Sequence, residues 1–244
     1  MKYMGSKSRI VNDILPIMLS EMGDKTAFVD AFCGGCSVIE NVPNHYRRIA
    51  NDKNKYLIAM WKMLTDDTST KPPIRIERDF YCDVRDSFNK QDSRYTNEIK
   101  GWVGFMGSFN GRFFDGGYSG HNVTIGNRKT RDYISENINN TMTQIPKLKG
   151  VEWQNCNYWE MVIPNNSLIY CDIPYKGTKQ YLTSKNFDYQ KFYEWCRQMK
   201  RNGHTIFVSE YEMPEDFNCV WSKQVTTAMN QINTKKQVEK LFSI

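Results

Sequence analysis

The sequence predicts an α/β fold in which a parallel sheet is interrupted by an inserted module. Short apolar strands alternate with helical segments in the first part of the chain, as is typical of parallel strands joined by crossover helices. This alternation stops near residue 66 and resumes near residue 141. We therefore expect residues 1–65 and 141–244 to form one α/β domain, with residues 66–140 inserted as a separate module.

The first region begins with a helix over 8–22 and an apolar strand over 27–31. A glycine turn and a further helix follow this strand. A second strand over 48–50 ends at Asn51-Asp52, and a helix over 56–64 completes the region. This order of elements is the one expected for adjacent parallel strands.

The middle region differs in composition, because aromatic, glycine and basic residues interleave in the run GFMGSFNGRFFDGGYSGHNVTIGNRKTR. Asn110-Gly111 and Asp115-Gly116 are dipeptides of the kind that close β-hairpins. We therefore expect the module of residues 66–140 to contain a β-hairpin.

The alternating pattern returns in the last third of the chain. It predicts a strand over 167–171, a helix over 188–201 that Gly203 ends, a strand over 205–209 and a last strand over 238–244. These elements extend the parallel sheet of the first region.

The composition excludes several classes of protein. With 244 residues, of which 40% are apolar, the chain can bury a sizeable core and is no peptide hormone or disulfide-stapled miniprotein. A net charge of +6 weakly favours a polyanionic partner. No apolar run reaches the roughly 18 residues that cross a bilayer, and no secretory signal begins the chain, so we expect a soluble cytoplasmic protein without a membrane partner.

The cysteine pattern points to neither disulfides nor metal. Seven cysteines is an odd number, and they are scattered along the chain. Cys33 and Cys36 form a CxxC pair without a second pair, and the chain has only three histidines. We expect these thiols to pack in the core and no metal to bind.

A glycine turn after the first strand suggests a nucleoside cofactor. The strand over 27–31, which contains Asp30 and is followed by Phe32, runs into Gly34 and Gly35, where backbone and ligand can approach closely. Asp52 follows Gly34 by eighteen positions, about where nucleotide-binding α/β folds place a carboxylate for ribose hydroxyls. The alternative is an ordinary glycine turn with a solvated aspartate.

A second group of candidate residues follows the strand over 167–171. Asp172, Ile173, Pro174 and Tyr175 lie where that strand reaches the carboxyl edge of the sheet, the edge at which open α/β sheets bind ligands. Asp172 and the Ile173 carbonyl can accept hydrogen bonds from the exocyclic amine of a base, and Tyr175 can stack on its ring. A plain turn is the alternative.

Together these segments resemble the Dam-type (D12 class) N6-adenine-specific DNA methyltransferases. Four segments carry the resemblance, and they occur in the family's order: Lys-Tyr-x-Gly-Ser-Lys at 2–7, Phe-Val-Asp-x-Phe-Cys-Gly-Gly at 28–35, Ala-Asn-Asp at 50–52 and Asp-Ile-Pro-Tyr at 172–175. Ile173 departs from the family's Asp-Pro-Pro-Tyr, although the backbone carbonyl assigned to that position is retained.

The resemblance implies a Rossmann-like class I methyltransferase sheet with an inserted DNA-recognition module. It implies S-adenosylmethionine as the cofactor, S-adenosylhomocysteine as the product and no metal. The implied catalytic residues are Asp172, Ile173, Pro174 and Tyr175. The implied cofactor-binding residues are Tyr3, Gly5, Lys7, Asp30, Phe32, Gly34, Asp52, Tyr158 and Asp172, where Asp30 could instead cap a turn and Tyr158 could instead pack in the core.

The inserted module is expected to grip double-stranded DNA. Arg112 and Phe113 could enter a groove or wedge a base step, while Arg128, Lys129 and Arg131 could meet phosphates. The aromatic residues could equally form the module's own core, and the basic residues a solvated face.

The implied reaction is transfer of a methyl group to N6 of an adenine flipped out of duplex DNA, in the cytoplasm of a bacterium or a phage-infected cell. Two alternatives remain: a DNA-binding homologue without activity, and an N4-cytosine methyltransferase. The sequence leaves open the recognition sequence, the oligomeric state and a restriction endonuclease partner.

Overall fold

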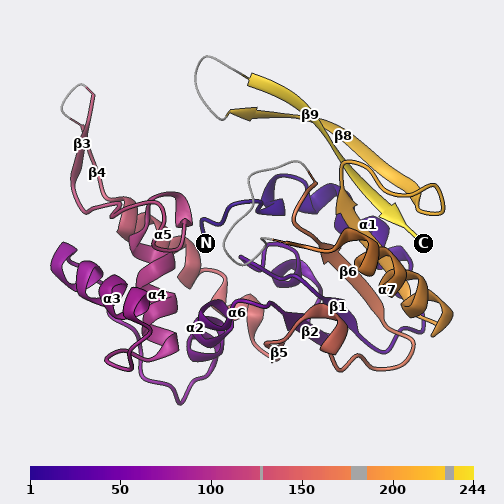
Figure 1. The fold of residues 1–244 in the computed structure, drawn as a ribbon, viewed down its shortest axis with the longest axis horizontal. Helices are drawn as coiled ribbons and strands as arrows, with labels where there is room; N and C mark the ends of the chain where they lie inside the picture. Colours follow the sequence, from indigo (N-terminus) through magenta and orange to yellow (C-terminus); the bar gives the residue numbers. More distant parts are fainter. Residues whose placement is uncertain (127–128, 177–185, 229–233) are drawn as a thin grey trace.

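The computed structural model describes residues 1–126, 129–176, 186–228 and 234–244. Its centre is a seven-stranded sheet in the order β5-β2-β1-β6-β7-β9-β8 (Figure 1). The first five of these strands run parallel to one another. Strand β9 runs antiparallel to both of its neighbours, β7 and β8. This arrangement confirms the predicted α/β fold.

The strands of the main sheet are β1 Phe28–Asp30, β2 Arg48–Asn51, β5 Val151–Gln154, β6 Leu168–Asp172, β7 Thr205–Glu210, β8 Asn218–Ala228 and β9 Thr234–Ser243. A separate hairpin pairs β3 Val123–Ile125 with β4 Lys129–Arg131. The α-helices are α1 Val11–Ser20, α2 Lys55–Thr65, α3 Arg78–Lys90, α4 Asn97–Gly107, α5 Tyr133–Met142, α6 Ile145–Leu148 and α7 Tyr189–Arg201. The 3-10 turns in the described ranges are η1 Lys7–Arg9, η2 Ile39–Asn41, η3 Phe109–Gly111 and η4 Tyr158–Glu160.

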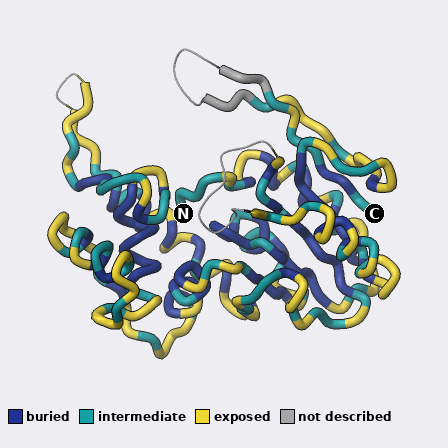
Figure 2. The backbone as a smooth tube through the Cα atoms, viewed as in Figure 1, coloured by how far each residue is buried: buried dark blue, intermediate teal, exposed yellow. Residues whose placement is uncertain are grey.

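Strand β1 lies at the centre of the parallel region and is buried on both faces. Phe28 and Leu168 pack in the core on one face of the sheet, whereas Val29 and Ile169 pack in the core on the other face. Alternate residues of a strand point to opposite faces, so a strand covered on both sides must be apolar throughout. Figure 2 shows these central strands as buried.

Polar side chains set the start of the major helices. Asn54 caps α2 by accepting hydrogen bonds from the backbone N–H groups of Tyr56 and Leu57. Asp188 caps α7 by accepting from the backbone N–H of Lys191. These caps satisfy backbone donors that have no partner within the helix.

Two predicted helices differ from the structure. The helix expected after the glycine turn is only the 3-10 turn η2, because Gly34 and Cys36 adopt positive φ angles that interrupt helical geometry. The helix expected over 8–22 is divided at Ile10, whose φ of −125° separates η1 from α1.

Residues 66–140 supply α3, α4, the β3–β4 hairpin and most of α5, which lie at one end of the molecule (Figure 1). Helix α4 packs on α2 so closely that a Cβ atom at Gly101 would lie 2.1 Å from the Tyr56 carbonyl oxygen. The boundaries of an inserted module at 66 and 140 remain a prediction.

The hairpin of this region was expected at the wrong turn. Asn110-Gly111 lies in η3, and the loop around Asp115-Gly116 folds back so that Ser108 bridges to Tyr118. The Ser108 hydroxyl accepts a hydrogen bond from the buried backbone N–H of Phe114. These local bonds close a compact loop, and the observed hairpin is formed by β3 and β4 instead.

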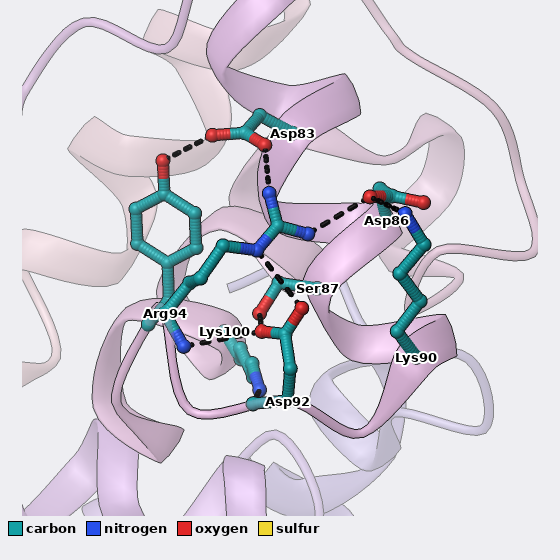
Figure 3. Close-up of polar contacts among 8 residues, drawn as sticks. Asp83, Asp86, Ser87, Lys90, Asp92, Arg94 and Lys100 are labelled. Atoms are coloured by element: carbon teal, nitrogen blue, oxygen red, sulfur yellow. Dashed lines mark hydrogen bonds and ion pairs between the residues drawn. The ribbon is translucent and has the colours of Figure 1, made fainter.

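A charged network fastens the loop after α3 to that helix (Figure 3). The Arg94 guanidinium lies 2.6 Å from Asp83, 2.8 Å from Asp86 and 2.8 Å from Asp92. Hydrogen bonds from Ser87 and Arg94 lower the pKa of Asp92 to about 2. The charged groups of the network are partly or fully exposed to solvent, so we assign the network to local order rather than to global stability.

No helix in the described ranges is long and apolar enough to cross a membrane.

Arg48 joins the sheet to the end of α6 through buried hydrogen bonds. Its guanidinium donates to the carbonyl of Lys147 at 2.7 Å, to that of Val42 at 3.3 Å and to that of Lys149. Its side chain is 3% exposed and has no carboxylate partner in the described part of the chain. Three backbone carbonyls therefore depend on one cation.

We expect Arg48→Met to lower the free energy of unfolding by about 2–4 kcal/mol, because it leaves buried carbonyls without donors. Chemical denaturation of the purified variant measures this change. The neighbouring Arg47→Met is the matched control, since Arg47 pairs with Glu152 on the surface and should matter much less. Equal losses in the two variants would contradict this account.

Candidate active site

Three carboxylates meet at one edge of the sheet. Asp30 ends β1, Asp172 ends β6 and Asp52 follows the last residue of β2. Because β1 pairs in parallel with both β2 and β6, the ends of the three strands lie side by side, with Asp30 opposite Ala50 and Tyr170. Asp52 and Asp172 therefore flank Asp30 at the same edge.

Asp30 is the most deeply buried of the three. It is 2% exposed, and its Oδ1 atom has no hydrogen-bond partner among the described residues. Burial, and then the negative charges of Asp172 and Asp52, raise the pKa of this carboxyl well above its usual range. The backbone N–H groups of Phe32 and Ile39 counter this only in part.

Asp172 has a cationic partner from the N-terminal segment. The Lys7 ammonium lies 2.6 Å from Asp172 Oδ1, donates to the Gly5 carbonyl at 3.1 Å and stands 4.7 Å from the centre of the Tyr175 ring. Burial raises the pKa of Asp172, and the charge of Lys7 opposes that rise. The predicted residues Lys7, Gly5, Asp172 and Tyr175 are thus brought together.

The N-terminal segment also covers the glycine turn. The Lys7 backbone N–H donates to the Ser37 hydroxyl at 3.0 Å. The Tyr3 ring lies on the turn, so a Cβ atom at Gly34 or Gly35 would be 2.7 Å from that side chain. Both glycines are therefore required by the close approach of Tyr3, and Gly34 also by its φ of +45°.

Asp52 organises the other side of this turn. Its carboxylate accepts a hydrogen bond from the Gly34 N–H at 3.1 Å and one from the Asn54 N–H at 2.8 Å. Burial raises its pKa, although these two bonds act in the opposite direction. The predicted pair of glycine turn and acidic strand end is thus in direct contact.

Asn51 is a structural residue that the sequence analysis did not select. Its side chain donates to the Ala31 carbonyl at 3.1 Å and to the Cys156 carbonyl at 3.2 Å, and it accepts from the Cys156 N–H. It is 1% exposed and holds the ends of β1 and β5 together. The Ala-Asn-Asp motif at 50–52 was the available signal, because a buried asparagine at a strand end needs backbone partners.

The turn after β6 is held at several points. The Ile173 side chain is 2% exposed, and the Pro174 carbonyl accepts from the Tyr189 hydroxyl at 2.9 Å. The Tyr175 hydroxyl donates to Glu239 at 2.7 Å. A turn with one proline in place of two is therefore fixed by neighbouring side chains.

Tyr158 packs in an aromatic cluster rather than beside the carboxylates. Its ring centroid lies 5.4 Å from that of Phe32 and 5.4 Å from that of Phe192. Burial raises the pKa of its hydroxyl, which has no partner among the described residues. This packing is the second of the two interpretations that the sequence left open for Tyr158, and it also places Phe32 in the cluster.

The candidate DNA-binding residues are not gathered in one place. Arg112 pairs with Asp115 beside η3, while Lys129 and Arg131 lie exposed on the β3–β4 hairpin (Figure 1). The Arg131 guanidinium forms two bonds with Glu136, at 2.7 and 2.8 Å. Arg128 lies outside the described residues.

Phe113 lies inside an aromatic cluster of the helical region. Its ring centroid is 4.8 Å from that of Phe105, 5.1 Å from that of Phe88 and 5.4 Å from that of Tyr56. This is the arrangement of a module core, which was the alternative to a DNA-contacting wedge.

A hollow of about 710 Å³ lies away from the carboxylates. Trp159, Trp195, Asn166 and His204 are among its lining residues. Asn166 and His204 precede β6 and β7, so the hollow lies at the amino edge of these strands, opposite to the edge of Asp172.

No group of three or more His, Cys, Asp or Glu side chains among the described residues is arranged to hold a metal ion.

The sequence matches one family of known proteins. The sequence matches the family of D12 class N6 adenine-specific DNA methyltransferases over residues 3–239. No curated protein matches the sequence.

Among solved structures, the fold is similar to the crystal structure of SMU.472, a candidate methyltransferase in complex with SAH. The sequences are 10% identical, the TM-score is 0.37, and the match covers 98% of this chain and 52% of that one. The chain thus spans about half the length of that protein.

We expect Asp30→Asn to stabilise the cofactor-free protein at neutral pH. A raised pKa means that the folded chain holds the Asp30 proton more tightly than the unfolded chain does. Ionisation of Asp30 therefore lowers the free energy of unfolding. This loss is small near pH 4 and grows as the pH rises. We predict a melting temperature at least about 2 °C higher at pH 7.5, and a smaller gain at pH 4.5.

Thermal unfolding at the two pH values measures this difference, with the exposed Asp24→Asn as the control. A gain for Asp30→Asn that does not depend on pH, or a loss at pH 7.5, would show that the Asp30 carboxyl is not under electrostatic strain.

Proposed function

Because the chain belongs to the family of D12 class N6 adenine-specific DNA methyltransferases, we propose that it transfers a methyl group from S-adenosylmethionine to N6 of an adenine flipped out of duplex DNA. One observation supports this proposal most strongly: Asp52 and Asp172 flank Asp30 at one sheet edge. Asp52, which would bind the ribose of the cofactor, and Asp172, which would accept hydrogen bonds from the target amine, can therefore belong to a single site.

The residues at this edge fit the cofactor. The Asp52 carboxylate is only partly buried and can accept hydrogen bonds from ribose hydroxyls. Asp30 carries a buried oxygen without a partner in the described structure, which a donor group of a ligand would satisfy. Tyr3, Gly5, Lys7, Phe32 and Gly34 complete the proposed cofactor site, and Tyr158 supports it through Phe32.

When bound, S-adenosylmethionine supplies an electrophilic methyl group on its sulfonium. Adenine N6 is a weak nucleophile because its lone pair is conjugated with the ring. Asp172 and the Ile173 carbonyl accept hydrogen bonds from the two N–H groups of the amine and so draw the nitrogen toward tetrahedral geometry. The Asp172 carboxylate can take the proton that N6 loses when the N–CH3 bond forms and the S–CH3 bond breaks. Lys7 contacts Oδ1 of Asp172, which keeps this carboxylate charged and oriented.

Tyr175 provides the surface on which the flipped base stacks, and Pro174 shapes the turn between the two catalytic groups. Flipping costs a few kcal/mol, and stacking on an aromatic ring offsets part of that cost. The in-line displacement needs no covalent enzyme intermediate and no metal, so the cysteines have no part in it.

The duplex is proposed to contact the β3–β4 hairpin. Lys129 and Arg131 are exposed there, and phosphate contacts of this kind position a protein without reading sequence. Arg128 is a further candidate for a phosphate contact, and Arg112 is a candidate for a contact in a DNA groove. Phe113 would act indirectly, through the packing of the module.

The direct test of this function is incorporation of tritiated methyl groups into mixed-sequence duplex DNA. Digestion of the product to nucleosides should yield tritiated N6-methyl-2′-deoxyadenosine. N4-methyl-2′-deoxycytidine would support the cytosine alternative, and no incorporation would support a DNA-binding homologue without activity.

We expect Asp172→Ala to reduce methyl transfer below detection while DNA binding and folding survive. The variant removes the main acceptor for the target amine, and loss of a preorganised electrostatic group commonly costs 10²-fold or more. Single-turnover incorporation measures the loss, with the surface variant Asp67→Ala as the control. Undiminished transfer would remove Asp172 from the catalytic residues.

We expect Asp52→Ala to weaken cofactor binding by about 2–4 kcal/mol, the value of a pair of charge-assisted hydrogen bonds. Isothermal titration with S-adenosylhomocysteine measures the change in affinity. An unchanged dissociation constant would assign Asp52 to the support of the glycine turn alone.

A further inference from the structure

The Tyr175 side chain is held by groups from three distant parts of the chain. The Lys7 ammonium stands 4.7 Å from the ring centre. The Tyr211 ring meets the Tyr175 ring edge-to-face, with centroids 4.5 Å apart and planes at 79°. The Tyr175 hydroxyl donates to Glu239 Oε2 at 2.7 Å. The residue is 9% exposed, and these contacts contribute to holding its orientation.

The bond to Glu239 reaches beyond the neighbouring strand. Tyr175 follows β6, Glu239 lies in β9, and β7 separates these two strands in the sheet. β9 belongs to the long β8–β9 hairpin, which extends well past the end of the parallel strands (Figure 1). The hydrogen bond therefore joins Tyr175, the proposed base-stacking residue, to strand β9, which contains none of the four family motifs.

β9 presents a second acceptor on the same face. Gln237 is two residues from Glu239, so the two side chains point the same way, and its Oε1 atom accepts from the Tyr211 hydroxyl at 2.8 Å. The Tyr211 backbone N–H in turn donates to the buried Glu210 carboxylate at 2.7 Å. Both rings are therefore fixed by β9 through their hydroxyl groups.

Glu239 is also near the amine-accepting carboxylate. Burial and, more weakly, the charge of Glu239 raise the pKa of Asp172. At Asp172 the charge of Glu239 therefore acts in the opposite sense to that of Lys7. The direct contact of Glu239 is its hydrogen bond from the Tyr175 hydroxyl.

We propose that Glu239 is a positioning residue, whose carboxylate fixes the Tyr175 ring in the orientation that receives the flipped base. This proposal rests on the proposed function, because ring orientation matters only if a base stacks there. Without its hydrogen-bond acceptor the Tyr175 phenol can tilt within the site, and even a small misplacement of the flipped base slows a displacement reaction strongly. Glu239 touches neither base nor cofactor in this account and acts through Tyr175.

The test is a double-mutant cycle on turnover. Glu239→Ala removes the acceptor, Tyr175→Phe removes the donor while keeping the ring, and the double variant removes both. With unmethylated plasmid DNA and tritiated S-adenosylmethionine, we expect each single variant to lower kcat about tenfold. The double variant should be no slower than the slower single variant, and KM for S-adenosylmethionine should stay within about twofold.

Two further variants separate positioning from general damage. Glu239→Gln keeps an oxygen that can accept from Tyr175 and should restore kcat to within about threefold of the wild type. Glu215→Ala changes an exposed carboxylate in the segment between β7 and β8 and should leave kcat unchanged. Thermal unfolding of all variants checks that they fold.

Independent effects, with the double variant about a hundredfold slower, would show that Glu239 does not act through the Tyr175 hydroxyl and would overturn the proposal. An unchanged kcat in Glu239→Ala would do the same. A wild-type protein that incorporates no methyl groups would instead refute the proposed function, so the two failures are distinguishable.

Discussion

The close approach of three carboxylates at the ends of adjacent parallel strands is the constraint on which the rest of the site depends. Parallel pairing of β1 with β2 and β6 forces Asp52, Asp30 and Asp172 to one edge. Burial raises the pKa of all three carboxyls, and the negative charges of Asp172 and Asp52 raise that of Asp30 further. The surrounding residues compensate part of this burial of charge. Lys7 forms an ion pair with Asp172, and the backbone N–H groups of Gly34 and Asn54 donate hydrogen bonds to Asp52.

Features encoded locally could be predicted from the sequence. The order of apolar strands and helices predicted the sheet, since strands Phe28–Asp30 and Leu168–Asp172 consist of buried apolar and aromatic residues up to the aspartates that end them. The contact between Gly34 and Asp52 followed from their spacing, because neighbouring parallel strands bring a first turn and a second strand end together. Lys7 was identified from a motif, and the structure brings it to Asp172.

Features that depend on tertiary packing could not be predicted. Strand β8 was not predicted because its largely polar sequence lacks the apolar alternation of a half-buried strand, and it forms by pairing with β9. Nothing in the local sequence of Glu239 indicates a partner 64 positions away at Tyr175. Phe113 lies in a run rich in basic and aromatic residues, yet it is partly buried and packs against the core through Phe105 and Phe88.

A crystal structure of the protein with S-adenosylhomocysteine tests the central claim most directly, namely that the two outer carboxylates serve one site. The account predicts ribose hydroxyls within hydrogen-bond distance of Asp52 and the sulfur atom facing Asp172, with Asp30 paired to a ligand donor. Product bound in the hollow beside Trp159 and Trp195, or bound at the strand edge without reaching both carboxylates, would contradict it.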